Sequence, residues 1–170
     1  MEFKASFDSL TKFMTVGIAI LFVVIGYRSI KALSVAHGDV KLILFHGGLL
    51  LFLITVFACS YMFSVKSYSV DNNQLVIKKV MGERRIDISD LMEIRLVEKG
   101  EMLGTIRTFG NGGLFGYYGK YYNRTFGSMT LYTTRRTNRI FLKTISGNKI
   151  IISPDDLSLA DMLKSGSTKR

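Results

Sequence analysis

The chain has 170 residues, of which 48% are hydrophobic, and a formal net charge of +10. The only cysteine, Cys59, excludes a disulfide framework and a cysteine-based metal site. The part after residue 65 contains 18 Lys and Arg against 10 Asp and Glu, so most of the basic excess lies there. A basic surface suits anionic lipid or nucleic acid, and general solubility accounts for it equally well.

The first predicted element is an apolar helix. Residues 1–12 are mixed polar and apolar, and residues 13–27 carry no charge. Those 15 residues would span only about 22 Å as a helix, so a membrane-spanning helix must continue through Arg28 and Lys31 to about Val35. A signal peptide and a re-entrant segment remain alternatives, although both basic residues lie where signal peptides are usually uncharged.

The second apolar run is the strongest signal in the sequence. Residues 42–65 contain no charged side chain and would form a helix about 36 Å long, against a hydrocarbon core of about 30 Å. A buried helix of a soluble core is the alternative, but uncharged runs of this length are typical of membrane spans. We therefore predict a transmembrane helical hairpin over residues 13–65, with helices at about 13–35 and 42–65.

The basic residues around the two runs predict the orientation. The link at residues 28–41 carries three Lys or Arg, whereas the two opposite flanks carry seven. By the positive-inside rule, both termini lie in the cytoplasm. The protein is then multi-pass, with its soluble domain at the cytoplasmic face of the membrane.

From Tyr68 onward the apolar pattern changes from a helical period to a period of two, interrupted by turn residues. Strands are predicted at residues 68–70, 75–77, 84–88, 92–97, 129–133, 140–144 and 149–153. In one of them Met92, Ile94 and Leu96 share a face. Pro154 ends the last strand and suits the start of a helix that runs to about Lys164, before a tail at residues 165–170. Residues 66–164 are thus predicted to be an all-β barrel or split barrel of about seven strands with one C-terminal helix.

Residues 110–119 contain five glycines. A dinucleotide fingerprint would need glycine where Phe115 stands, and a P-loop would need Ser or Thr where Tyr121 stands. A strand-loop-strand unit is the better interpretation, with glycines such as Gly116 at positions where a side chain is sterically excluded. Phe115, Tyr117 and Tyr121 alternate with Gly116 and Tyr118 at strand period, so one face of this unit is expected to enter the barrel and the other to face lipid or a partner.

Aromatic and basic residues that alternate can stack nucleic-acid bases, but next to a membrane anchor the lipid interface explains them better. We therefore predict no nucleic acid and no small-molecule substrate. The predicted contact residues for lipid or a partner are Lys78, Lys79, Arg84, Arg85, Tyr117, Tyr118, Lys120 and Tyr121.

Catalytic constellations are not found in the sequence. His37 and His46 have only Asp39 as a nearby carboxylate, which is too little for a metal site. His46 is interpreted as an interface residue, and the adjacent Gly47 and Gly48 as small residues that let the helices pack closely. No catalytic, cofactor or metal residue is predicted.

The order of these motifs resembles that of the bacterial pleckstrin-homology (PH) domain membrane proteins. The resemblance covers residues 10–164, and its most specific part is the glycine and aromatic stretch at residues 112–119, followed by Ser153-Pro154. It implies a PH-like barrel of about seven strands capped by one helix, a bacterial inner-membrane location and no catalytic residues. The chain has no tryptophan, which eukaryotic PH domains usually carry in the closing helix, so phosphoinositide binding does not transfer.

These observations predict a non-enzymatic, membrane-anchored interaction module. Its PH-like domain would bind a partner protein, another copy of itself or the membrane surface. Two alternatives remain: a subunit of an oligomeric channel or transporter built from the helix pair, and a binder of anionic lipid headgroups through the basic hairpin at residues 78–85.

Overall fold

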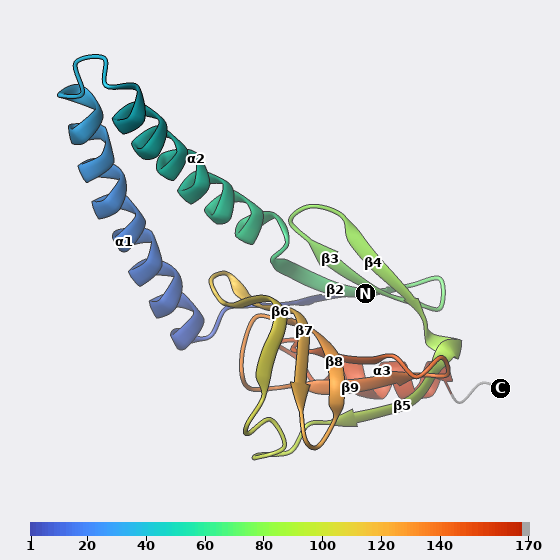
Figure 1. Ribbon diagram of the computed structural model, residues 1–170. Coiled ribbons are helices and arrows are strands. Elements are labelled where there is room, and N and C mark those ends of the chain that lie inside the picture. Colours follow the sequence, from blue (N-terminus) through green and yellow to red (C-terminus); the bar gives the residue numbers. More distant parts are fainter. Residues whose placement is uncertain (168–170) are drawn as a thin grey trace.

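A computed structural model describes residues 1–167 and shows two long helices projecting from a β domain (Figure 1). Helix α1 (Ser9–Ser34) and helix α2 (Val40–Met62) are both long and apolar enough to cross a membrane. The two predicted helices of membrane-span length are therefore confirmed. α1 begins four residues earlier than predicted because the Asp8 side chain caps it by accepting a hydrogen bond from the Thr11 N–H.

Two open sheets form the β domain, and neither closes on itself within residues 1–167. The first has the order β1-β2-β3-β4 and the second the order β5-β9-β10-β8-β7-β6; every pairing is antiparallel except β10 with β8. The strands are β1 Glu2–Lys4, β2 Val65–Asp71, β3 Gln74–Lys79, β4 Glu83–Asp87, β5 Leu91–Leu96, β6 Ile106–Gly113, β7 Gly116–Asn123, β8 Gly127–Thr133, β9 Ile140–Thr144 and β10 Lys149–Ile152.

The main core lies between the two sheets and the C-terminal helix α3 (Ser158–Ser167). Helix α3 buries Leu159, Ala160 and Leu163, so the predicted C-terminal helix is confirmed. Tyr68 is fully buried, and its hydroxyl donates to the carbonyl of Tyr132 at 2.6 Å and accepts the N–H of Ser153 at 3.1 Å. Burial raises the pKa of Tyr68 to about 12, so this hydroxyl stays neutral and joins the two sheets at any physiological pH.

A second apolar cluster lies on the opposite face of the six-stranded sheet. Because side chains alternate along a strand, Phe141 and Ile151 point to this face while their neighbours point into the main core. Tyr117, Tyr121 and Leu131 join them, and Val97 and Met102 from the loop after β5 cover part of the cluster. This second face is the one on which a cleft forms.

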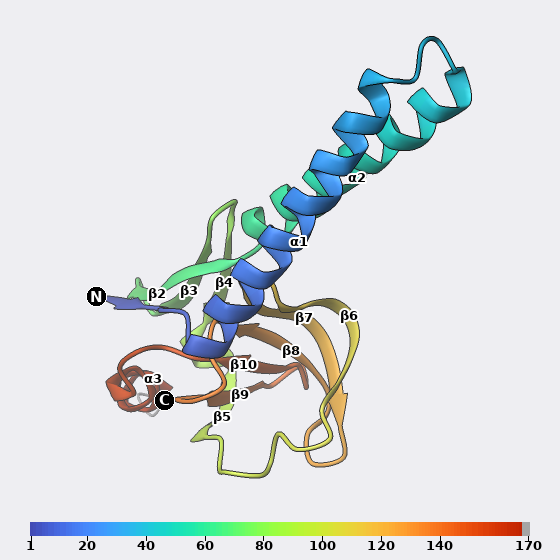
Figure 2. The same ribbon diagram turned by 90° about the vertical axis from the view of Figure 1, so that its left-hand side faces the viewer.

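Strand β1 was not expected from the sequence, which left residues 1–12 without regular structure. It pairs with β2, placing Phe3 opposite Tyr68, and Phe3 and Ala5 are buried in the core (Figure 2). The chain therefore leaves the first sheet to build α1 and α2 and returns to the same sheet as β2. The helical hairpin is attached to the domain by two adjacent strands.

The β5 residues predicted to share a face differ in burial: Met92 and Leu96 are 58% and 45% exposed, whereas Ile94 packs against the main core. The strand has an irregularity between Leu91 and Glu93, and Leu91 is buried in the core.

One local expectation from the sequence, close packing of the two helices at Gly47 and Gly48, was wrong. A Cβ atom added to Gly47 or Gly48 of α2 would have no atom of another element within 4 Å. In contrast, a Cβ atom added to Gly26 of α1 would lie 3.7 Å from the Leu50 side chain of α2.

Candidate functional site

The tip of the β6–β7 hairpin lies between the bases of the two helices (Figure 1). The Thr15 hydroxyl of α1 accepts the N–H of Phe115 at 3.0 Å. On the other side, the Phe115 ring packs edge-on against Phe57 and Tyr61 of α2, with ring centroids 5.1 and 5.3 Å apart. Contacts to both helices hold the hairpin in place, so its two faces have fixed orientations relative to the helices.

Glycines allow this hairpin to form. Gly110 and Gly119 are directly opposite each other, and a side chain on either would collide with the backbone of the facing strand. A Cβ atom on Gly116 would lie 2.8 Å from the carbonyl oxygen of Thr133, and the φ of +116° is itself unfavourable for other residues. The expectation that Gly116 occupies a position where a side chain is excluded therefore agrees with the geometry.

One face of the hairpin is turned toward α2. Tyr118 on this face donates its hydroxyl to the carbonyl of Ser60 at 2.7 Å and accepts from Asn111 Nδ2 at 2.9 Å. Partial burial raises the pKa of the Tyr118 hydroxyl, which keeps it a donor. Tyr118, predicted as a contact residue for lipid or a partner, thus uses its polar group within the chain, whereas Lys120 is exposed.

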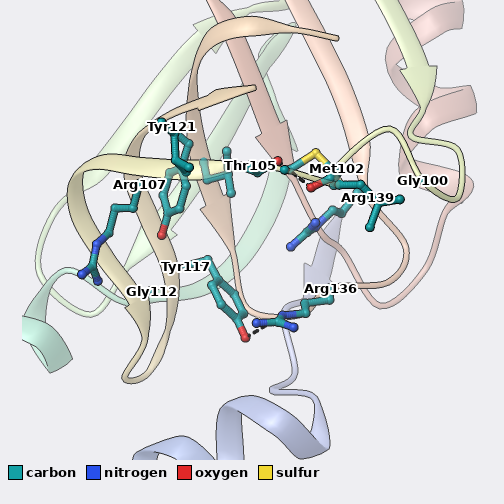
Figure 3. Close-up of a pocket in the computed structure, with 13 residues that line it drawn as sticks. Gly100, Met102, Thr105, Arg107, Gly112, Tyr117, Tyr121, Arg136 and Arg139 are labelled. Carbon is teal, nitrogen blue, oxygen red and sulfur yellow. Dashed lines mark hydrogen bonds between the residues drawn. The ribbon is translucent and has the colours of Figure 1, made fainter. Parts of the chain in front are cut away.

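The other face of the hairpin forms one wall of a cleft of about 750 Å³ (Figure 3). Tyr117 and Tyr121 line it together with Leu131, the loop at residues 100–106, Arg107 and Gly112 of β6, and two arginines from the turn between β8 and β9. We call it the arginine cleft, after Arg136 and Arg139. Two of the eight contact residues predicted from the sequence therefore meet in one cavity.

The charge of Asp8 acts on both Arg136 and Arg139 of the cleft without forming an ion pair with either. Arg136 donates through Nε to the Tyr117 hydroxyl at 3.1 Å, with its guanidinium 5.3 Å from the ring centroid. Arg139 is half-buried and donates to the carbonyl of Arg135. Burial and then the adjacent Arg136 lower the pKa of Arg139. No carboxylate within residues 1–167 forms an ion pair with either arginine.

The basic β3–β4 hairpin is different. Lys78 lies 3.3 Å from the Glu2 carboxylate, and Arg85 lies 2.6 Å from Glu83. Arg84 stacks over the Tyr132 ring, and Lys79 over the Phe63 ring, at 5.9 and 5.6 Å from the centroids. The four basic contact residues predicted on this hairpin therefore all have partners within the chain, and they do not line the arginine cleft.

Sequence reasoning missed Arg107, Arg136 and Arg139. The sequence pattern predicts a turn at residues 135–138, although three arginines at residues 135–139 are a visible charge cluster. Folding separates them: Arg135 pairs with Asp155, which leaves Arg136 and Arg139 for the cleft.

Metal-binding groups are absent from residues 1–167: no three His, Cys, Asp or Glu side chains are placed to hold an ion. His37 in the helix link pairs its Nδ1 with the carbonyl of Val35. His46 in α2 packs edge-on against Phe45, and its buried Nδ1 has no hydrogen-bond partner within the same residues. Neither histidine belongs to a group of three such side chains within residues 1–167.

Residues 66–165 match the family model described as a bacterial PH domain, which amounts to 100 of the 170 residues. No curated protein and no solved structure matches the chain. The matched segment begins within β2 and extends into α3, so it covers both sheets except β1 and excludes the two helices.

Proposed function

The chain belongs to the bacterial PH domain family, and on this premise we propose that it is a non-catalytic, membrane-anchored module that binds an acidic segment of a partner protein in the arginine cleft. PH domains are generally interaction modules rather than enzymes. Two helices long and apolar enough to cross a membrane supply the anchor.

The observation that carries this proposal is that neither Arg136 nor Arg139 forms an ion pair within residues 1–167. Guanidinium groups bind carboxylates through two parallel hydrogen bonds, and the partial burial of Arg139 strengthens such bonds by lowering the local dielectric, whereas Arg136 is exposed. The ring of Tyr117 already holds Arg136 in position, so little side-chain freedom remains to be lost on binding. A volume of about 750 Å³ is of the size that accommodates a few side chains of a bound segment.

The position of the cleft favours a partner at the membrane surface. The backbone N–H of Arg136 donates to the Asp8 carboxylate at 3.0 Å, and Asp8 caps the first turn of α1. The cleft therefore lies beside the base of a helix that we propose to span the membrane. An acidic segment close to another protein's membrane anchor would reach it without the domain having to move.

Binding of a hexaglutamate peptide to the full chain in detergent tests the proposal. We expect the double variant Arg136→Gln/Arg139→Gln to lose at least about tenfold in affinity, since each lost charged pair contributes about 1.5–3 kcal/mol. Lys78→Gln/Arg85→Gln removes the same charge outside the cleft and should retain most of the affinity. Equal losses in the two variants, or equal binding of hexaglutamine, would contradict the proposal.

The same proposal includes a cytoplasmic domain, supported by the basic bias of the flanks. With Cys59 replaced by serine, a cysteine at Ser146 or Ser167 should resist membrane-impermeant thiol reagents in intact cells, and one at His37 should react. The reverse labelling pattern would overturn this orientation while leaving the cleft proposal intact.

A further inference from the structure

We propose that a groove between the helices and the β6–β7 hairpin binds one anionic phospholipid of the bilayer, with an acyl chain against α1 and α2 and its phosphate beside Lys79 and Arg107. The groove has a volume of about 820 Å³ and opens on the α2-facing side of the hairpin, where Tyr118 lies. It opens on the other face of the hairpin from the arginine cleft, and Arg107 and Gly112 line both cavities.

Both helices supply the apolar part of the groove. Ile18, Leu21 and Phe22 line it from α1, and Val56 and Cys59 line it from α2. None of these residues carries a charge, and each belongs to a helix of membrane-span length. In a bilayer this part of the groove lies at the depth of the acyl chains, so a hydrocarbon chain is the natural occupant.

Aromatic residues mark the level at which the groove leaves the apolar region. Phe63 caps the end of α2, and Phe109 of β6 is 77% exposed. Both line the groove. Aromatic rings are enriched at the headgroup level of membranes, so this end of the groove corresponds to the membrane–water interface.

Two cations lie at this same end. Lys79 is half-buried, and its strand partner Val65 follows α2 by only a few residues. Arg107 of β6 lines the groove, and its guanidinium points away from Arg136 and Arg139 (Figure 3). Neither Lys79 nor Arg107 forms an ion pair with a carboxylate within residues 1–167. Two unneutralised cations at the headgroup level suit a phosphate group.

The hydrogen bonds of Tyr118 hold the groove open before any ligand arrives. Its hydroxyl joins the hairpin to Ser60 at the base of α2, and Ser60 and Tyr118 both line the groove. A preformed site of this size fits lipid chains. A transmembrane helix about 10–12 Å wide and about 30 Å long has several times the volume, which argues against a second copy's helix as the occupant.

Cys59, the only cysteine of the chain, lines the groove and is a native probe for its occupancy. The full chain in a neutral detergent is treated with N-ethylmaleimide in the presence of phosphatidylglycerol or of phosphatidylcholine at the same mole fraction. We expect phosphatidylglycerol at ten times its Kd to slow alkylation about tenfold, because only the free groove reacts. Phosphatidylcholine, which has no net charge, should slow it much less.

Variants separate the headgroup from the chain. Lys79→Gln/Arg107→Gln should abolish the difference between the two lipids, whereas Lys66→Gln/Lys120→Gln, with the same charge change outside the groove, should preserve it. Leu21→Trp should fill the apolar part and reduce the phosphatidylglycerol retained in native mass spectrometry. Soluble glycerol phosphate should not protect Cys59.

Four outcomes would overturn the proposal: equal protection by both lipids, protection that survives Lys79→Gln/Arg107→Gln, protection by glycerol phosphate alone, and protection that follows protein concentration rather than lipid. The last of these would assign the groove to a second copy of the chain. Protection of Cys59 is measured without the peptide, so the two sites can fail separately. Because Arg107 lines both cavities, hexaglutamate binding is measured for Lys79→Gln/Arg107→Gln as well.

Discussion

The β3–β4 and β6–β7 hairpins differ in how their side chains are used, although sequence patterns predicted both as contact regions. In β3–β4, Lys78 and Arg85 are paired with carboxylates and Arg84 lies over a ring. The glycine-rich β6–β7 hairpin packs between the helices, and each of its faces forms the wall of a cavity. Arg107, Arg136 and Arg139 line these cavities and form no ion pair within residues 1–167, and Lys79 of β3 also lines the cavity on the α2-facing side. The number of Lys and Arg in a segment therefore says little about binding; what matters is whether the fold supplies partners for them.

The largest expected effect tests whether glycine makes the β6–β7 hairpin different. Gly119→Val adds a side chain that collides with the backbone of Phe109 and Gly110, at a φ of +115°. We expect the free energy of unfolding of the full chain in detergent to fall by about 3 kcal/mol or more. Arg85→Val in exposed strand β4 should change it by no more than about 0.5 kcal/mol. Similar losses in both variants would remove the distinction between the hairpins.

Arg139→Lys tests whether the cleft needs a guanidinium group or only a positive charge. The substitution keeps the charge and removes the planar guanidinium group. Lysine cannot form two parallel hydrogen bonds to one carboxylate, so hexaglutamate affinity should fall by about fivefold to tenfold, or about 1 kcal/mol. Arg85→Lys in the β3–β4 hairpin should leave the affinity unchanged. An unchanged affinity in Arg139→Lys would mean that net charge alone attracts the peptide.

Tyr118→Phe tests how the β6–β7 hairpin is attached to α2. The change removes the hydroxyl that joins Ser60 to Asn111 and leaves both polar groups without this partner. A loss of about 1 kcal/mol in the free energy of unfolding is expected. Tyr122→Phe is the matched control because Tyr122 lies on the same face of β7, is 46% exposed and has no such bond. Equal stability of the two variants would show that the bond is not required.

The smallest effect concerns the partner that neutralises Lys78. A hydrogen bond from Ser67 and the charge of Lys78 lower the pKa of Glu2 below its ordinary value of 4.5. A lowered carboxyl pKa means that the pair is complete above that value and is lost as the pH falls below it. Glu2→Gln makes the same change at pH 7 and should raise hexaglutamate affinity less than about twofold, as exposed pairs are weak. A larger gain would show that Glu2 masks a binding site on the β3–β4 hairpin.

Much of the fold was predictable because local hydropathy patterns determine its helices and strands. The uncharged segment at residues 42–65 and the alternating runs such as residues 140–144 and 149–153 give helices and strands near the predicted positions. Strand β1 was not predictable, since three residues carry no measurable period and their partner β2 lies more than 60 residues away. The irregularity in β5 was likewise invisible, because a shift of one residue changes which side chains are buried without changing composition.

The candidate site was only partly predictable. Tyr117 and Tyr121 were found through their strand period, whereas Arg136 and Arg139 looked like ordinary turn residues. Arg136 and Arg139 are left without an ion pair because Asp155 pairs with Arg135 instead. Glu2 likewise pairs with Lys78, which is 76 positions away in the sequence. Such pairings cannot be deduced from spacing, because they depend on which loops the sheets bring together.

By itself the sequence determined the two helices of membrane-span length, the β domain and its closing helix, because hydropathy and its period act over neighbouring residues. Only the tertiary structure decided that the N-terminal segment completes the first sheet, that the glycine-rich hairpin lies between the helices, and which cations stay without partners. The physical reason is that burial and charge neutralisation are long-range properties. A lysine beside Glu2 and an arginine in an open cleft look equally basic until the chain has folded around them.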